Sequence, residues 1–229
     1  MTLSTLNSQR FSKPHCNPSI TSLGTIQEYH NVLRKHGCTG CELGCQPDFY
    51  GPVVYRGNPE AKKIIIGEAP GLHEDKKGKP FVGPAGKLLD TLFTQAGWNI
   101  EKDWLITNCV FCRPKAPQGS GRQNLTPQSK HHQACRPYIS QILSNMKPEI
   151  VVLLGKTAAQ SIMEWPVSTR MSDIVGKIYI KEEWLDTIFY VMYHPAALLH
   201  NKGQVQHTTM NEAMNKHLLD LRQIIKELR

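Results

Sequence analysis

The sequence predicts an α/β protein, a three-layer α/β/α sandwich around a central, mainly parallel four-stranded sheet. The chain contains four short apolar runs, at 62–66, 104–110, 150–154 and 188–193. Longer segments with apolar residues at helical spacing separate these runs. Strands that alternate with helices in this way form parallel sheets covered on both faces. We place the domain at residues 25–229, after a polar tail at 1–24 that has no Asp or Glu.

The first two helices are marked by their ends. Thr25 and Glu28 form a capping box that starts a short helix, and Gly37 suits its C-terminus. After the first strand comes a long loop rich in Gly and Pro. A second helix then begins with Pro84 in its first turn, and Gly97 stops it.

The later elements continue the same alternation. Thr126 and Pro127 are the expected cap and first residue of a long helix on which Cys135 faces inward. An edge hairpin is expected around residues 175–180. Thr209 is expected to cap the last helix.

Charge and hydropathy narrow the function classes. The chain has 229 residues and a formal net charge of +8, which favours a polyanionic partner such as nucleic acid, although a merely soluble basic protein fits nearly as well. No apolar run approaches the roughly 18 residues of a membrane span, and the first 25 residues lack the apolar core of a signal peptide. We therefore expect a cytoplasmic protein with no membrane contact, whose seven cysteines are thiols or metal ligands.

Three loops leave the carboxyl ends of the predicted strands and carry polar or aromatic side chains. This edge of an open α/β sheet is where ligands bind. A carboxylate pair, an aromatic ring, an amide and an imidazole together suit a planar polar ring, although each has an ordinary structural explanation taken singly. The side chains are Glu68, Glu74, Asp75 and Phe81 in the first loop, Asn108 in the second and His194 in the third.

The cysteines suggest a second site. Cys38 and Cys41 form a Cys-x-x-Cys pair just beyond a helix, a common half-site for metals. Cys112 and Cys135 would complete a set of four thiolates, which bind zinc or an iron–sulfur cluster; spacing does not decide between them. Cys45 is a rival for one ligand position. Cys16 and Cys109 are left over, and Cys109 lies inside a predicted strand.

At this point the motifs resemble a known family, the iron–sulfur uracil-DNA glycosylases of family 4. The family's first motif is matched by GEAPGLHEDKKGKPFVGPAGKLLD at 67–90, and its asparagine-containing strand with a cluster cysteine by ITNCVFCRP at 106–114. Its last cluster cysteine is matched by QACRPY at 133–138, and its histidine motif by YHPAALL at 193–199. The resemblance covers residues 26–225 and implies the uracil-DNA glycosylase fold.

The resemblance implies an enzyme that flips deoxyuridine out of DNA and cuts the bond between base and sugar. Phe81 would stack on the uracil, and Asn108 would pair with its Watson–Crick edge, rejecting cytosine. Glu74 would crowd out the C5 methyl of thymine. His194 would donate a hydrogen bond to O2 as negative charge builds on the departing base.

The resemblance also assigns the rest of the site. Gly67 and Ala69 would line the base pocket, and Ala69 stands where a better-known branch of the superfamily has the Asp that directs the attacking water. Glu68 and backbone carbonyl groups are then the candidates for orienting that water. Leu198 and Leu199 resemble the wedge that enters the duplex.

The same resemblance makes the metal a structural 4Fe-4S cluster, with zinc as the alternative. Its ligands would be Cys38, Cys41, Cys112 and Cys135. Two departures from the family pattern affect the DNA side more than the chemistry. Residues 118–124 lengthen the link between the last two cluster cysteines, and the histidine motif continues as Leu-His-Asn-Lys at 199–202 where an Arg and a Pro are typical.

The leading hypothesis is a monomeric, monofunctional glycosylase that acts on uracil-containing DNA in base excision repair and leaves an abasic site. An enzyme for other deaminated bases is disfavoured by Asn108. The alternative hypothesis, from a different class of function, is a catalytically silent DNA-binding module with the same fold in a phage or replication assembly. Intact Asn108 and His194 argue against this alternative.

Overall fold

The computed structural model describes residues 25–38, 40–46, 50–200 and 205–228, so the predicted tail lies outside it. In this part of the chain one six-stranded sheet has the order β1-β3-β2-β4-β6-β5. The strands are β1 (Tyr55–Gly57), β2 (Lys63–Gly67), β3 (Leu105–Asn108), β4 (Ile150–Leu154), β5 (Ile178–Lys181) and β6 (Trp184–Met192). The four inner strands are parallel, as predicted from the apolar runs, and antiparallel β1 and β5 are added at the edges.

The register of the sheet brings the predicted loops together. Gly67 at the end of β2 pairs with Asn108 at the end of β3, and β6 ends at Met192, two residues before His194. Because all four inner strands run the same way, their carboxyl ends meet at one edge. This edge carries the candidate site.

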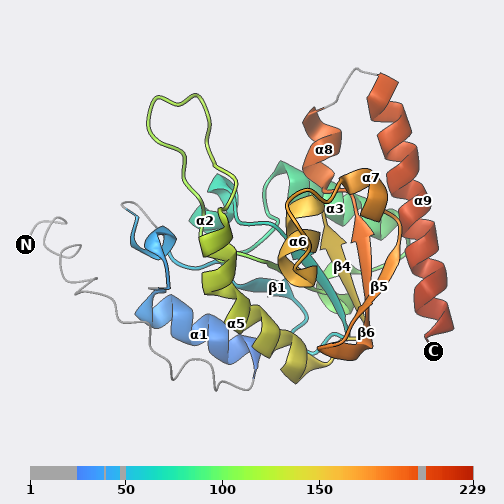
Figure 1. Cartoon of the computed structure of the whole chain (residues 1–229), viewed down its shortest axis with the longest axis horizontal. Coiled ribbons are helices and arrows are strands. Elements are labelled where there is room, and N and C mark those ends of the chain that lie inside the picture. Colours follow the sequence, from blue (N-terminus) through green and yellow to red (C-terminus); the bar gives the residue numbers. More distant parts are fainter. Residues whose placement is uncertain (1–24, 39, 47–49, 201–204, 229) are drawn as a thin grey trace, which may run out of the picture.

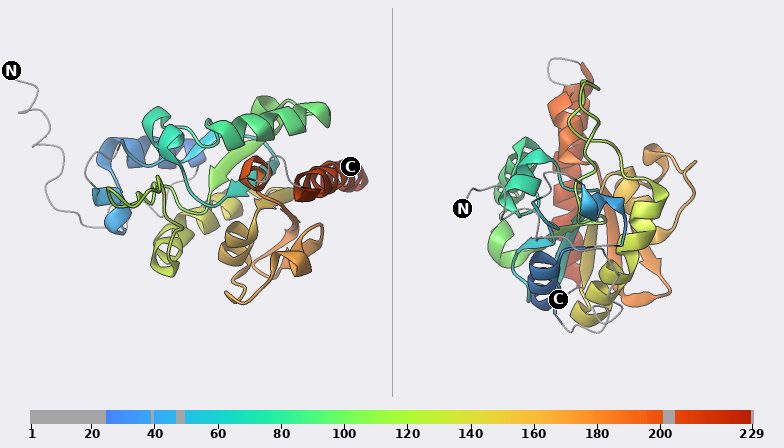
Figure 2. Two further views of the ribbon diagram at one scale, coloured as in Figure 1. Left: turned by 90° about the horizontal axis from the view of Figure 1, so that it is seen from above. Right: turned by 90° about the vertical axis from the view of Figure 1, so that its left-hand side faces the viewer.

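Helices cover both faces of the sheet (Figures 1 and 2). One face packs against α1 (Ile26–His36), α5 (Ser129–Met146), α6 (Lys156–Met163) and α7 (Met171–Ile174). The other packs against α3 (Pro84–Gln95), α4 (Ile100–Asp103), α8 (Pro195–His200) and α9 (Val205–Glu227). None of the helices in the described residues has the length and apolar character needed to cross a membrane.

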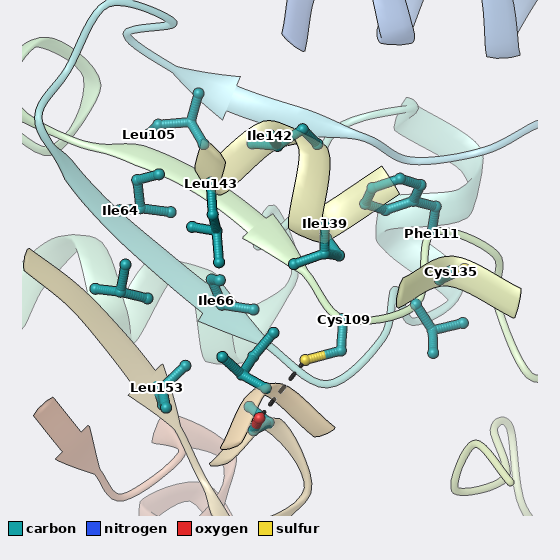
Figure 3. Packing of buried hydrophobic residues seen from close by; sticks show 14 of the residues in the cluster. Ile64, Ile66, Leu105, Cys109, Phe111, Cys135, Ile139, Ile142, Leu143 and Leu153 are labelled. Atoms are coloured by element: carbon teal, nitrogen blue, oxygen red, sulfur yellow. Dashed lines mark hydrogen bonds between the residues drawn. The ribbon is translucent and has the colours of Figure 1, made fainter. Parts of the chain in front are cut away.

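Alternation along β2 divides its side chains between the two cores. Ile64 and Ile66 face α5, where they meet buried side chains such as Ile139 and Leu143 (Figure 3). Ile65 belongs to the core under α3 and α9. This alternation confirms the three predicted layers.

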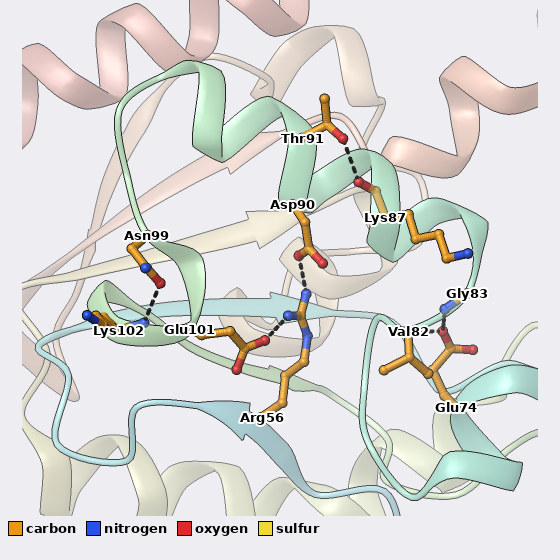
Figure 4. A network of polar contacts seen from close by, with 10 residues as sticks. All are labelled: Arg56, Glu74, Val82, Gly83, Lys87, Asp90, Thr91, Asn99, Glu101 and Lys102. Carbon is orange, nitrogen blue, oxygen red and sulfur yellow. Dashed lines mark hydrogen bonds and ion pairs between the residues drawn. The ribbon is translucent and has the colours of Figure 1, made fainter.

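Edge strand β1 is held in place by a polar contact. The buried Arg56 side chain pairs with Asp90 of α3 and Glu101 of α4 (Figure 4). A strand of three residues has too few positions to show alternation, which is why the apolar pattern did not reveal it.

Some element boundaries differ from the predictions. A short helix, α2 (Leu72–Lys77), interrupts the long loop, and a 3₁₀ helix, η2 (Glu42–Cys45), follows Cys41. The long helix α5 begins at Ser129 rather than at Pro127, because the Gln128 N–H donates to Nδ1 of His131 at 2.9 Å. The last helix begins at Val205, so Thr209 lies inside it rather than at its cap.

Candidate active site

A pocket of about 320 Å³ opens at the carboxyl edge of the sheet, between α2, the start of α3, the end of β3 and the start of α8. Four separate parts of the chain contribute to it. The lining residues are Ala69, Gly71, Leu72, His73, Glu74, Phe81, Gly83, Pro84, Ala85, Gly86, Asn108, Gln123, Asn124 and His194. The three predicted loops therefore meet, and they bring Glu74, Phe81, Asn108 and His194 together.

The floor of the pocket is tightly packed around Phe81 and Asn108. Asn108 is 2% exposed and Phe81 is 6% exposed, and Phe81 has a left-handed backbone with φ of 54°. A Cβ on Gly67 would lie 2.4 Å from Cζ of Phe81 and 2.6 Å from Oδ1 of Asn108. A Cβ on Gly86 would lie 1.8 Å from the backbone oxygen of Phe81. A Cβ at Gly67 would therefore displace the ring or the amide of the floor, and a Cβ at Gly86 would displace the backbone of Phe81.

His194 lies over this floor as a neutral imidazole. Its ring stacks on Phe81 with centroids 5.7 Å apart and planes 30° apart. Nδ1 accepts a hydrogen bond from the Ala196 N–H at 3.1 Å, so the ring proton is assigned to Nε2. Burial lowers the pKa of His194 to about 4, while the negative charge of Glu74 opposes the shift. His194 thus offers the pocket an N–H donor that carries no positive charge at neutral pH.

Glu74 holds the loop that carries Phe81. One carboxylate oxygen accepts the Val82 N–H at 2.9 Å and the Gly83 N–H at 2.7 Å (Figure 4), and the other accepts the Gly71 N–H at 3.1 Å. These three bonds join the start of α2 to the start of α3. Glu74 therefore lines the pocket and also fixes the backbone on both sides of Phe81.

Glu68 is not among the residues that line the pocket. Its carboxyl group hydrogen-bonds with Thr157 of α6, and burial raises its pKa. Gly67 faces the pocket floor, and side chains alternate along a strand, so the next side chain points to the opposite face. Ala69 does line the pocket, but the structure does not bring Glu68 to it.

The two predicted wedge residues differ in exposure. Leu198 is 3% exposed and packs in the core under α3 and α9. Its side chain would have to leave this core to enter a duplex, and its part in the wedge stays a prediction. Leu199 is half-buried and remains the candidate.

Three polar residues of the lining were not predicted. His73 lies on α2, and Gln123 and Asn124 lie in the loop before α5. No periodicity marks a side chain in a loop, so only the unusual length of residues 118–124 could have drawn attention to the last two.

The four predicted cysteine ligands gather at the end of the sheet near α1 and α5, and all are free thiols. A hydrogen bond with Cys112 lowers the pKa of Cys38 to about 7, and Cys41 and Cys135 act electrostatically on Cys112. Yet in the described part of the chain no three His, Cys, Asp or Glu side chains are arranged to hold one metal ion. Cys109 is also buried and acts electrostatically on Cys135, but its S–H donates to the Ala158 oxygen at 3.8 Å (Figure 3).

Ordinary contacts also hold the segment of Cys38 and Cys41 in place. Nε2 of Gln46 donates to the Arg113 oxygen at 2.9 Å, beside Cys112. A Cβ on Gly44 would lie 1.8 Å from the Cys38 oxygen, so the turn packs against its own start. Cys45 and Cys16 stay untested, because the side chain of the first and the whole of the second lie outside what the structure describes.

Comparison with known proteins places the chain among uracil-DNA glycosylases. The sequence model of the uracil DNA glycosylase superfamily matches residues 54–222. The type-4 uracil-DNA glycosylase of Archaeoglobus fulgidus is 37% identical over 182 residues, which cover 76% of this chain and 85% of that protein. The type-4 uracil-DNA glycosylase of Pyrobaculum aerophilum is 34% identical over 179 residues, which cover 76% of this chain and 84% of that protein.

Proposed function

The chain belongs to the uracil-DNA glycosylase superfamily and groups with its type-4 enzymes, and on this premise we infer that it excises uracil from DNA by hydrolysing the N-glycosidic bond. The observation that carries the proposal is the pocket floor. A buried asparagine and a buried aromatic ring meet under a neutral histidine. Such a floor suits a flat base that has been flipped out of the stack.

Asn108 selects the base in this proposal. Its amide N–H meets O4 of uracil, and its carbonyl oxygen meets N3–H. Cytosine inverts both groups and leaves two buried polar groups without partners, which costs about 1–3 kcal/mol each. Phe81 supplies the stacking face, and Gly67 leaves the space in which the ring and the amide approach each other.

His194 stabilises the leaving group. As the bond to the sugar breaks, negative charge develops on the base, and Nε2–H donates to O2. A preorganised donor of this kind supplies on the order of 3 kcal/mol of transition-state stabilisation. The lowered pKa keeps the ring neutral, so it positions this proton without transferring it.

The two carboxylates considered for the site, Glu74 and Glu68, differ in their proposed part. Glu74 stands at the pocket wall, where it would crowd out the methyl group of thymine while it holds the loop of Phe81. Glu68 was our candidate for orienting the attacking water, but it points toward Thr157. Because Ala69 offers no carboxylate, backbone carbonyl groups at the pocket are the remaining candidates for that task.

The substrate is DNA, and the positive surplus supports contact with its phosphates. Leu199 is the proposed wedge. We propose a monomeric enzyme that acts in base excision repair. The free thiols fit a reducing compartment, and we propose the cytoplasm.

We propose that Cys38, Cys41, Cys112 and Cys135 hold a 4Fe-4S cluster. The fit rests on the donor set: four thiols from three parts of the chain lie near enough to shift one another's pKa. Four thiolates are the ordinary ligands of such a cluster, and zinc remains the alternative. When bound, it would cross-link the segment after α1 to β3 and α5, without a part in the hydrolysis.

An alkali-cleavage assay on uracil-containing oligonucleotides tests the function. We expect strand breaks only after alkali, because the enzyme leaves an abasic site. His194→Ala should lower the excision rate about 10²–10³-fold. Asn108→Ala should cost a similar factor, whereas Glu68→Ala should stay within about fivefold, because that side chain faces away from the pocket.

The same assay separates the alternative of a silent DNA-binding module. A wild-type protein that binds uracil-containing DNA without releasing uracil would establish that module and end the enzyme proposal. Equal losses in all three variants would show that the division of roles is wrong.

A further inference from the structure

The loop before α5 turns back on itself beside the pocket. Lys115 and Asn124 form an isolated antiparallel bridge, and the Ala116 N–H donates to the Gln123 oxygen at 3.3 Å. These paired residues, 115–116 and 123–124, form the stem of the loop. Residues 117–122 beyond the stem are exposed. In Figures 1 and 2 the loop and α8 extend beyond the sheet at the same end. The stem therefore stands at the pocket, and the tip lies in solvent.

The side chain of Arg113 holds this stem in place by hydrogen bonds. Its Nε–H donates to Oδ1 of Asn124 at 2.6 Å, and an Nη2–H donates to the Gln123 oxygen at 2.7 Å. Nη1 lies 3.8 Å from the carboxylate of Asp75 on α2, and both charged side chains are buried. A buried guanidinium thus ties the stem to the helix that carries Glu74. Such a fork fixes its partners in both position and orientation.

The fork also decides which way the amide of Asn124 points. A guanidinium has only donors, so Oδ1 must face Arg113 and Nδ2 must face away from it. Nδ2 lies 3.3 Å from the Cβ position of Gly71, on the pocket wall. The rim of the pocket therefore presents an N–H donor that belongs to an exposed residue.

We propose that Asn124 binds a phosphate of the DNA backbone next to the flipped nucleotide, with Arg113 as its positioning residue. The inference rests on the proposed function. The base reaches the floor, where Asn108 is 2% exposed, so the sugar and phosphates remain at the rim. Phosphate oxygens are the acceptors that a nucleotide offers there. The nearby carboxylate of Glu74 accepts three backbone N–H groups, which offset its charge.

Steady-state kinetics of Asn124→Ala on a uracil-containing oligonucleotide test the proposal. We expect KM to rise roughly tenfold, the worth of one hydrogen bond to a charged group, with kcat within twofold of wild type. Asn124→Asp keeps an acceptor for Arg113 but loses both N–H groups, so it should fold normally and raise KM further. Ser120→Ala, in the exposed tip of the same loop, is the matched control and should leave KM unchanged.

A neutral methylphosphonate at the phosphate on either side of the deoxyuridine identifies the partner. At one of the two positions it should weaken binding by wild type roughly tenfold and binding by Asn124→Ala much less, since the two changes remove the same contact. Additive losses at both positions, an unchanged KM, or an equal loss in Ser120→Ala would overturn the proposal. A wild-type protein without excision activity would instead reject the proposed function, and the binding comparison would still test Asn124.

Discussion

The lowered pKa of His194 keeps its ring neutral, and the residues around it explain why. Its Nδ1 is occupied by the Ala196 N–H, so only Nε2 faces the pocket as a donor. Phe81 covers one face of the ring, and burial disfavours a charge on it. In the mechanism proposed above, such a neutral donor would position its proton at the departing base and be unchanged when the product leaves.

The lowered pKa of His194 predicts how stability depends on pH. In the unfolded chain the ring binds a proton below its ordinary pKa near 6.5, but in the folded protein it does so only near 4. The unfolded state therefore binds more protons between these values, and stability is lost as pH falls from about 6.5 to 4. Urea unfolding from pH 4 to 7 should show a loss up to about 3 kcal/mol larger in wild type than in His194→Gln. Parallel curves for the two proteins would show that the folded ring titrates normally.

In the motif at 67–90, the carboxylate of Glu74 joins helix α2 to the start of helix α3. Glu74 sits in the first turn of α2 and accepts N–H groups from the residues that lead into α3. The turn between them carries Phe81 in a left-handed conformation that costs of order 1 kcal/mol. The surrounding hydrogen bonds hold the ring against this strain.

Glu74→Gln should loosen this turn. A glutamine has one acceptor oxygen in place of two, and its NH₂ group would face a backbone N–H, so at least one bond is lost. We expect a cost of about 2 kcal/mol, which lowers Tm by roughly 4–8 °C for a chain of this size. Calorimetry measures the shift, and Glu182→Gln, at an exposed position of the β5–β6 turn, is the control. An unchanged Tm in Glu74→Gln would mean that the three bonds contribute nothing to stability.

The elements also show what the sequence determines. Apolar runs followed by polar residues were sufficient to predict the four parallel strands, and with them the meeting of Phe81, Asn108 and His194. The direction of the Glu68 side chain was not predicted, because it depends on where β2 ends relative to the bend into the loop. Asn124 was not predicted either, since a distant arginine, rather than local spacing, fixes its position.

For the whole molecule, the four cysteines lie on parts of the chain that the sheet does not join. Cys38 and Cys41 follow α1, Cys112 follows β3, and Cys135 lies on α5. Hydrogen bonds such as that from Gln46 to Arg113 hold the same parts, but each contributes only about 1 kcal/mol. A bound cluster would therefore dominate the attachment of this layer to the sheet.

Loss of one ligand tests this view of the molecule. Anaerobically purified wild type should contain iron and acid-labile sulfide, and Cys135→Ser should lose both, with a fall in Tm of about 10 °C, because metal binding contributes directly to folding. Cys109→Ser is the control: its thiol is buried nearby but bonds to Ala158, so iron should be retained. Cys41→Ser should lose iron as well; retention would favour Cys45 as the ligand. Zinc without iron in wild type would sink the cluster assignment, while the uracil pocket, which shares no residue with these thiols, would stand.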